Sequence, residues 1–202
     1  MTLKQLYVMV INISKNMMKI QSWLLIILLF FACGNRQKIV EELSQLQSKP
    51  IMLPQQSRFT ILGKDTVLMD FMKENQLKLL IYTDSSECSS CTVNKMFLWD
   101  NLIEYSRRYK GDLKFYFIFS PRQQDEKGIR IALTNNAFDY PVILDTLGQF
   151  EKLNSHLPKN KALHTFLLDE NNNVILVGDP LYNKKIREMF YQIVEDRLGK
   201  PE

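Results

Sequence analysis

Two cysteines three positions apart, placed between an apolar run and a long segment without glycine or proline, constrain the fold of this chain most. The run Leu79–Tyr82 has the composition of a buried strand, and residues 88–108 contain neither glycine nor proline. Apolar residues recur there at intervals of three and four: Met96, Trp99 and Ile103. This spacing predicts one helix over residues 88–108, so Cys88 and Cys91 stand where a strand leads into a helix.

The rest of the chain past residue 58 predicts a regular alternation of strands and helices. The expected strands cover residues 59–62 and 66–68, which form a hairpin, and then 78–83, 113–119, 142–144, 163–168 and 174–177. The other expected helices cover residues 125–135, 149–154 and 184–198. The order β-α-β-α-β-β-α after the hairpin indicates an α/β fold, with a central mixed sheet covered by helices on both faces.

The N-terminal part of the chain reads as a targeting segment. The apolar run Trp23–Ala32 is about half as long as the roughly 20 residues that a membrane-spanning helix needs. A basic residue, Lys19, precedes the run and a small residue closes it, as in a secretory signal peptide. We therefore expect residues 1–32 to be a signal peptide. Residues 1–16 are either an extended n-region or an upstream misreading of the start site, because Met17 would begin a signal of normal length.

The stretch Leu29-Phe30-Phe31-Ala32-Cys33 resembles a bacterial lipobox, although Phe30 stands where leucine is commoner. The resemblance implies that the Cys33 thiol takes a diacylglyceryl group and becomes the mature N-terminus. Gly34 rather than aspartate follows, and by resemblance to bacterial sorting rules this implies an outer-membrane lipoprotein that faces the periplasm. Residues 33–57 are then the lipidated N-terminus and a tether, and residues 58–202 are the folded domain.

The charge of the chain argues against nucleic acid as a partner. The formal net charge is +4, from 26 basic and 22 acidic residues. Three of the basic residues, Lys4, Lys15 and Lys19, precede Cys33, so the mature chain has 23 basic residues and a net charge of about +1. Nucleic-acid binding needs a concentrated basic face.

Export from the cytoplasm, which the signal peptide predicts, would place the chain where disulfides persist.

The chemistry predicted from the sequence belongs to the two spaced cysteines. Residues three apart on a helix share one face, so the two sulfurs can pair. The free amides of the first helical turn favour a thiolate on Cys88, which makes it the attacking thiol. Cys91, nearer the helix body and expected to be less exposed, suits the resolving role. A structural disulfide and a metal site remain alternatives for the pair.

The region from Phe59 to Leu198 resembles the thioredoxin superfamily, in its extracytoplasmic branch of thiol-disulfide lipoproteins of the Bacteroidetes kind. Three stretches carry the resemblance: Leu79–Cys91, Tyr140–Gly148 and Thr165–Ile175. It implies a thioredoxin-like fold and a thiol-disulfide oxidoreductase that uses the Cys88–Cys91 dithiol without a cofactor. It also implies protein thiols or disulfides as substrates and a membrane-linked reductant as partner.

Two positions depart from the pattern of that superfamily. His164 stands where most redox-active members have a cis proline facing the cysteines, and a non-proline cis bond costs about 2.5–4 kcal/mol, so we expect a trans peptide there. Glu87 precedes the first cysteine where an aromatic residue is common, and a nearby carboxylate opposes a thiolate. We therefore expect His164 and Glu87 to modulate the dithiol.

The alternative function is a binding module, either redox-inactive or metal-binding. Cys88, Cys91 and His164 would offer two sulfurs and one nitrogen, a set suited to copper or zinc, and this resembles the copper-chaperone branch of the superfamily. A thiol peroxidase is disfavoured, because its pattern needs proline seven residues before the reactive cysteine, where Ile81 stands.

Overall fold

The computed structural model describes residues 36–54, 58–68, 71 and 75–201. The predicted signal peptide and Cys33 lie outside these residues. Residues 36–46 are helical, and the boundary between two compact units, Met1–Glu41 and Glu42–Glu202, falls within this helix. Among the described residues, no helix has the length and apolarity that crossing a membrane requires.

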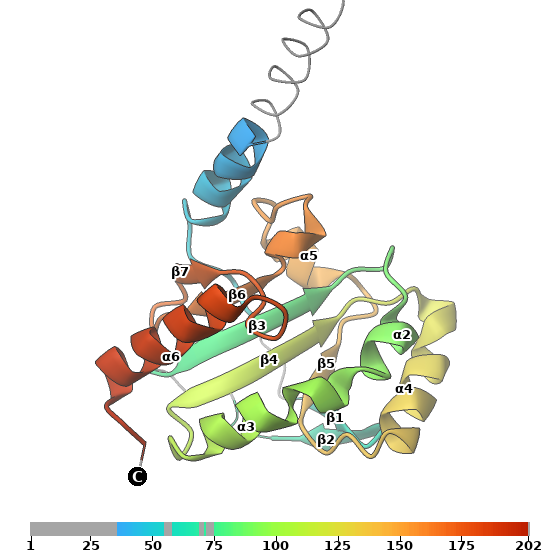
Figure 1. The fold of residues 1–202 in the computed structure, drawn as a ribbon. Helices are drawn as coiled ribbons and strands as arrows, with labels where there is room; N and C mark the ends of the chain where they lie inside the picture. The colour runs from blue at the N-terminus through green and yellow to red at the C-terminus, as the bar shows by residue number, and fades with distance from the viewer. Residues whose placement is uncertain (1–35, 55–57, 69–70, 72–74, 202) are drawn as a thin grey trace, which may run out of the picture. The chain divides into compact units, whose positions relative to one another are not determined.

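A seven-stranded mixed sheet forms the centre of the second unit (Figure 1). Its strands are β1 (Arg58–Ile61), β2 (Lys64–Val67), β3 (Leu77–Thr83), β4 (Leu113–Phe119), β5 (Val142–Leu144), β6 (Thr165–Leu168) and β7 (Val174–Val177). They lie in the order β2-β1-β5-β4-β3-β6-β7. The pairs β3–β4 and β4–β5 are parallel, and the remaining pairs are antiparallel. Each strand expected from the sequence is present.

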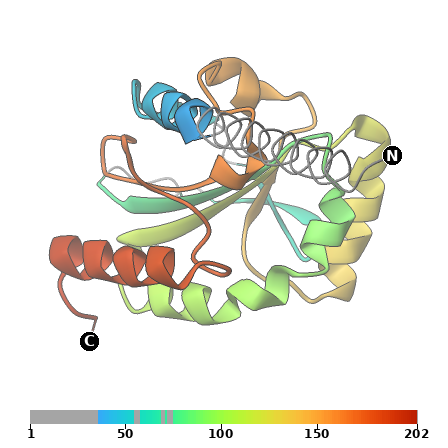
Figure 2. The ribbon, with the colours of Figure 1, turned by 45° about the horizontal axis from the view of Figure 1, so that its top comes forward.

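Helices cover both faces of this sheet (Figure 2). They are α2 (Ser89–Val93), α3 (Asp100–Arg107), α4 (Glu126–Asn135), α5 (Gln149–Leu153) and α6 (Lys184–Leu198), with short 3₁₀ turns η1 (Met96–Trp99), η2 (Gln123–Asp125) and η3 (Lys161–Leu163). The ring of Trp99 packs edge-on against Phe115 and Phe117 of β4 on one face. On the other face, Phe150 of α5 packs against Tyr82 of β3, with ring centroids 4.9 Å apart.

The connections identify the fold class. Strand β3 leads through α2 and α3 to the parallel strand β4, while β6 and β7 form an antiparallel hairpin on the other side of β3, followed by α6. This is the arrangement of a thioredoxin-like fold, extended by β5 and by the β1–β2 hairpin. The predicted α/β class, with a mixed sheet between helices, is confirmed.

The single helix expected over residues 88–108 is wrong. The segment divides into α2, the turn η1 and α3. The break comes at Asn94–Lys95, where Lys95 has φ −108° and ψ 5°, outside the helical region. It follows Thr92 and Val93, whose branched side chains weaken a helix. Met96 and Trp99, three residues apart and both buried, fit the 3₁₀ spacing.

The compact unit begins at Glu42, earlier than the boundary at residue 58 placed from the sequence. Leu46 and Ile51 are fully buried. The backbone N–H of Ile51 donates to the carbonyl of Asn172, and that of Met52 donates to Asn154 Oδ1. Part of the expected tether is therefore packed into the domain.

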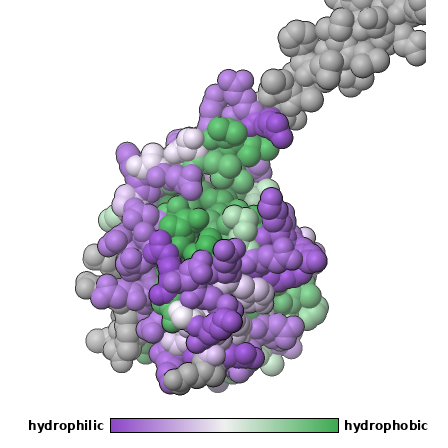
Figure 3. All heavy atoms as spheres, turned by 60° about the vertical axis from the view of Figure 1, so that its left-hand side comes forward, coloured by the Kyte–Doolittle hydropathy of each residue, from purple (hydrophilic) through white to green (hydrophobic). Residues whose placement is uncertain are grey.

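The surface combines a mostly hydrophilic face with scattered exposed apolar side chains. Figure 3 shows one such face, with an apolar area in its upper middle part. The exposed large apolar residues of the described chain include Phe97, Leu147 and Tyr182. Isolated side chains of this kind are normal on a folded domain.

Candidate redox site

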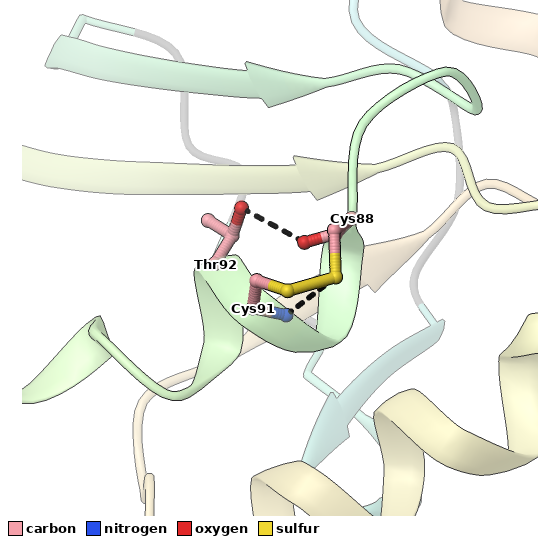
Figure 4. The surroundings of a disulfide bond; sticks show 3 residues. All are labelled: Cys88, Cys91 and Thr92. Carbon is pink, nitrogen blue, oxygen red and sulfur yellow. Dashed lines mark hydrogen bonds between the residues drawn. A yellow bond between two sulfur atoms is a disulfide. The ribbon is translucent and has the colours of Figure 1, made fainter.

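Cys88 and Cys91 form a disulfide at the turn between β3 and α2 (Figure 4). Their Cα atoms are 5.2 Å apart, within the usual range for a disulfide. Strand β3 ends at Thr83, the loop 84–87 leads out of the sheet, and Cys88 directly precedes α2. The buried strand thus fixes the start of the loop, and the first helical turn brings the two sulfurs together.

Hydrogen bonds from the first turn of α2 reach both the sulfur and the carbonyl of Cys88. Figure 4 shows the N–H of Cys91 donating to Cys88 Sγ at 3.3 Å and Thr92 Oγ1 donating to the Cys88 carbonyl at 3.4 Å. The N–H of Thr92 donates to the same carbonyl at 3.0 Å. Because α2 has only five residues, its dipole is small. The Cys91 amide is therefore the main local group that stabilises negative charge on Cys88 Sγ. Cys91 was expected to be the less exposed cysteine, but both are exposed, so burial does not separate their roles.

The two cysteines line different hollows. Cys88 lines a polar hollow of about 480 Å³, together with Arg122 and Asp125 near the start of α4. Cys91 lines a second hollow of about 270 Å³, together with His164. Glu87 lines both hollows. The sequence-predicted residues Glu87, Cys91 and His164 are therefore brought to one cavity.

His164 lies at the end of η3, directly before β6, and its carbonyl accepts a hydrogen bond from the N–H of Tyr82. No peptide bond among the described residues is cis, so the bond before His164 is trans as expected. The side chain is 6% exposed, and its Nε2 is 2.9 Å from the carbonyl oxygen of Pro158. The ring packs against Tyr82, with centroids 5.1 Å apart, while Nδ1 is buried without a hydrogen-bond partner.

Lys161 is a site residue that the sequence analysis did not find. Its Nζ lies 3.2 Å from Asp84 Oδ1 and 3.9 Å from Glu87 Oε1, and it also donates to Ser86 Oγ. Burial alone would raise the pKa of Asp84, but hydrogen bonds from Ser86 and the Lys161 ammonium outweigh it and lower that pKa. Lys161 therefore joins the loop before β6 to the loop before Cys88 and neutralises part of the acidic charge there.

The loop after β7 supplies further residues to the cavity of Cys91. Asp179 and Tyr182 line it, and the Tyr182 side chain is 71% exposed. Asp179 is partly buried, and its Oδ1 accepts the N–H of Leu181 at 2.7 Å. Burial raises the pKa of Asp179, although the backbone amides of Leu181 and Tyr182 act in the opposite direction. No spacing in the sequence connects this loop to the cysteines.

The residues that could bind a metal differ from the set expected from the sequence. The sulfurs of Cys88 and Cys91 are bonded to each other, so neither is a thiolate ligand in this structure. In the described part of the chain, the potential metal ligands that gather are Asp84, Glu87 and His164, whose donor atoms all lie within 4.8 Å of one another. Of the residues proposed as ligands, only His164 belongs to this group.

Solved structures similar to this chain include proteins of thiol-disulfide chemistry. A candidate protein disulfide isomerase from Bacteroides thetaiotaomicron is 20% identical, with a TM-score of 0.46 over 74% of this chain and 89% of its own. A candidate thiol:disulfide interchange protein DsbE from Chlorobium tepidum is 19% identical, with a TM-score of 0.45 over 72% of this chain and 95% of its own. Peroxiredoxin Q from Xanthomonas campestris, as a C48S mutant, is 12% identical, with a TM-score of 0.43 over 73% of this chain and 97% of its own.

Neither a protein-family model nor a curated protein sequence matches the chain.

Proposed function

We propose that this protein is a thiol-disulfide oxidoreductase that works through Cys88 and Cys91. The observation that carries the proposal is an exposed disulfide at a strand-to-helix turn, with the Cys91 amide directed at Cys88 Sγ. After reduction, the same amide would stabilise a thiolate on Cys88, and the thiolate is the nucleophilic form of cysteine. Because the pair is exposed and an amide contacts Cys88 Sγ, other proteins can reach it for thiol-disulfide exchange, which a buried structural disulfide would not allow.

The reaction is a pair of thiol-disulfide exchanges. The Cys88 thiolate attacks a substrate disulfide, whose S–S bond breaks as a Cys88–substrate bond forms and one substrate thiolate leaves. Deprotonated Cys91 then attacks Cys88 Sγ, which releases the second substrate thiolate and forms the Cys88–Cys91 disulfide. The substrate gains two electrons and two protons, and the protein dithiol loses them. A membrane-linked dithiol reductant restores the reduced protein.

Trapping tests the assignment of roles. A Cys91→Ser variant cannot resolve the mixed disulfide, so it should hold a model disulfide substrate on Cys88 until a reductant is added. The Cys88→Ser variant is the matched control and should trap little. Non-reducing electrophoresis and mass spectrometry measure both. Equal trapping by the two variants would remove the attacking role from Cys88.

Redox competence has its own measurement. Equilibration of the protein with reduced and oxidised glutathione, followed by alkylation of free thiols, gives the fraction of the Cys88–Cys91 disulfide. We expect one reversible two-electron transition. A disulfide that stays oxidised in excess glutathione, and that also fails to trap substrate as Cys91→Ser, would mark the pair as structural and overturn the proposal.

We further propose that the protein is a lipoprotein anchored through Cys33 in the outer membrane and facing the periplasm. The support is the short apolar run before Ala32-Cys33 and the absence of aspartate after it. A Cys33→Ser variant should remain as unprocessed precursor and lose its partition into detergent. Normal processing with continued membrane fractionation would contradict the lipid anchor.

A further inference from the structure

A set of potential metal ligands lies beside the redox pair but does not include it. Asp84 and Glu87 come from the loop before Cys88, and His164 comes from the end of η3. One donor atom from each lies within 4.8 Å of the others. Donor atoms on a tetrahedral ion with bonds near 2.0 Å are about 3.3 Å apart, so small rotations of the two carboxylates would close the set.

The state of His164 is a second and independent indication of a ligand. A carbonyl oxygen can only accept, so the contact between His164 Nε2 and the Pro158 carbonyl places the ring hydrogen on Nε2. Nδ1 then keeps a free lone pair, and it is buried without a partner. Metal-binding histidines show this arrangement, in which the second ring nitrogen donates to a backbone carbonyl and fixes the tautomer.

One ammonium group now lies between the two carboxylates and offsets part of their charge. Lys161 Nζ is 3.2 Å from Asp84 and 3.9 Å from Glu87. The Lys161 side chain is 40% exposed, so it can turn into solvent without leaving a buried cavity. The Lys161 ammonium donates to Asp84 and Ser86 and leaves His164 Nδ1 without a partner, so a cation that bonds both carboxylates and the imidazole could replace it.

We propose that Asp84, Glu87 and His164 form a site for a divalent transition-metal ion of the zinc type, which binds in exchange for the Lys161 ammonium. Two carboxylate oxygens and one imidazole nitrogen are ligands that Zn²⁺ accepts, and three protein ligands leave a fourth position for water. The site needs no thiolate, so it exists in the disulfide form of the protein. It is independent of the redox function proposed above.

The test uses untagged, fully oxidised full-length protein in detergent. Zn²⁺ is titrated into it, and calorimetry measures the heat of binding. We expect one equivalent to bind. Lys161→Met removes the competing charge and should bind Zn²⁺ at least tenfold more tightly, whereas Lys159→Met, an exposed neighbour, should bind like the wild type. Replacement of Zn²⁺ by Co²⁺ adds visible absorption bands that report nitrogen and oxygen ligands.

Loss of ligands completes the test. His164→Ala and Glu87→Gln should each weaken binding at least tenfold, and Glu87, being partly exposed, can be changed without disturbing the core. His156→Gln is the control, because His156 is the other histidine of the chain. The proposal is overturned if neither the wild type nor Lys161→Met binds Zn²⁺, or if Glu87→Gln and His164→Ala bind it unchanged.

Discussion

At the scale of single residues, charges next to Cys88 set how readily its thiolate forms. Glu87 adjoins Cys88 in the chain, and its carboxylate opposes a second negative charge. Lys161 lies 3.9 Å from Glu87 and offsets that carboxylate. The unfavourable charge can be recognised from the sequence, whereas the compensating one cannot, because 74 positions separate Lys161 from Glu87.

Opposite changes are therefore expected from two substitutions. Glu87→Gln should lower the pKa of the Cys88 thiol, and Lys161→Met should raise it. Two charges at a contact distance of about 4 Å interact by about 1 kcal/mol in water and more distant ones by less, so about fivefold is the upper limit for the change in the ratio of thiolate to thiol. Thiolate absorbance against pH in a Cys91→Ser background measures it, with Lys159→Met as control. Shifts of the same sign in both variants would contradict the electrostatic explanation.

His164 carries a separate prediction. If Nδ1 also takes a proton, the imidazolium favours the Cys88 thiolate, and His164→Ala then raises the pKa of the Cys88 thiol. His164→Pro should increase general disulfide reductase activity, if a proline at this position improves substrate docking. The same absorbance titration and an insulin-reduction assay measure the two effects. If both variants behave like the wild type, His164 does not modulate the dithiol.

At the scale of elements, one buried side chain joins the segment before β1 to the helix α5. Asn154 is fully buried at the end of α5. Its Oδ1 accepts the N–H of Met52, and its Nδ2 donates to the carbonyls of Met52 and Phe150, each at 2.8 Å. The two bonds to Met52 are partly buried and tie the segment before β1 to the end of α5, while the Phe150 carbonyl also accepts the backbone N–H of Asn154.

Asn154→Ala should therefore destabilise the domain. A buried donor or acceptor left unpaired costs about 1–3 kcal/mol, and this substitution removes the side-chain partner of both the N–H and the carbonyl of Met52, so we expect a loss within that range. Urea unfolding measures it. Asn136→Ala is the matched control, because Asn136 is exposed and its loss should change the free energy of unfolding by less than about 0.5 kcal/mol. Similar losses in both variants would show that the bonds to Met52 do not hold the segment in place.

At the scale of the whole molecule, a buried histidine connects folding to pH. His156 is 8% exposed, and burial is the main reason that its pKa lies below 6.5; the Lys49 charge adds to this, while a hydrogen bond to the Lys49 backbone opposes it. The unfolded chain therefore binds a proton at higher pH than the folded one. Stability from this residue is complete above about pH 6.5 and falls as the pH drops towards the lowered pKa.

His156→Gln should remove this part of the pH dependence. The wild type should lose more free energy of unfolding between about pH 7.5 and pH 5 than the variant does. The reason is that the unfolded wild type takes up a proton on His156 more readily than the folded wild type, and the variant has no such group. Urea unfolding at the two pH values gives both differences. An identical pH dependence in the two proteins would mean that His156 titrates alike in the folded and unfolded states.

The sequence by itself determined the strands and the place of the cysteines. Buried strands such as β3 and β4 are continuous apolar runs, and a cysteine pair between such a run and a segment free of glycine and proline can be recognised without knowing what packs on it. These local patterns were sufficient to predict the order of elements and the α/β class, whereas the thioredoxin-like fold was implied by the resemblance of three longer stretches.

Only the tertiary structure decided what meets the cysteines. After the break before η1, Met96 is buried and Trp99 packs on β4, and the packing of residues 46–54 depends on partners such as Asn154, about a hundred positions away. Lys161 reaches the loop before Cys88 because β6 pairs with β3, which brings the ends of two distant strands together. A contact between residues so far apart leaves no periodicity in the chain, because it depends on the pairing of the strands and not on the spacing of the residues.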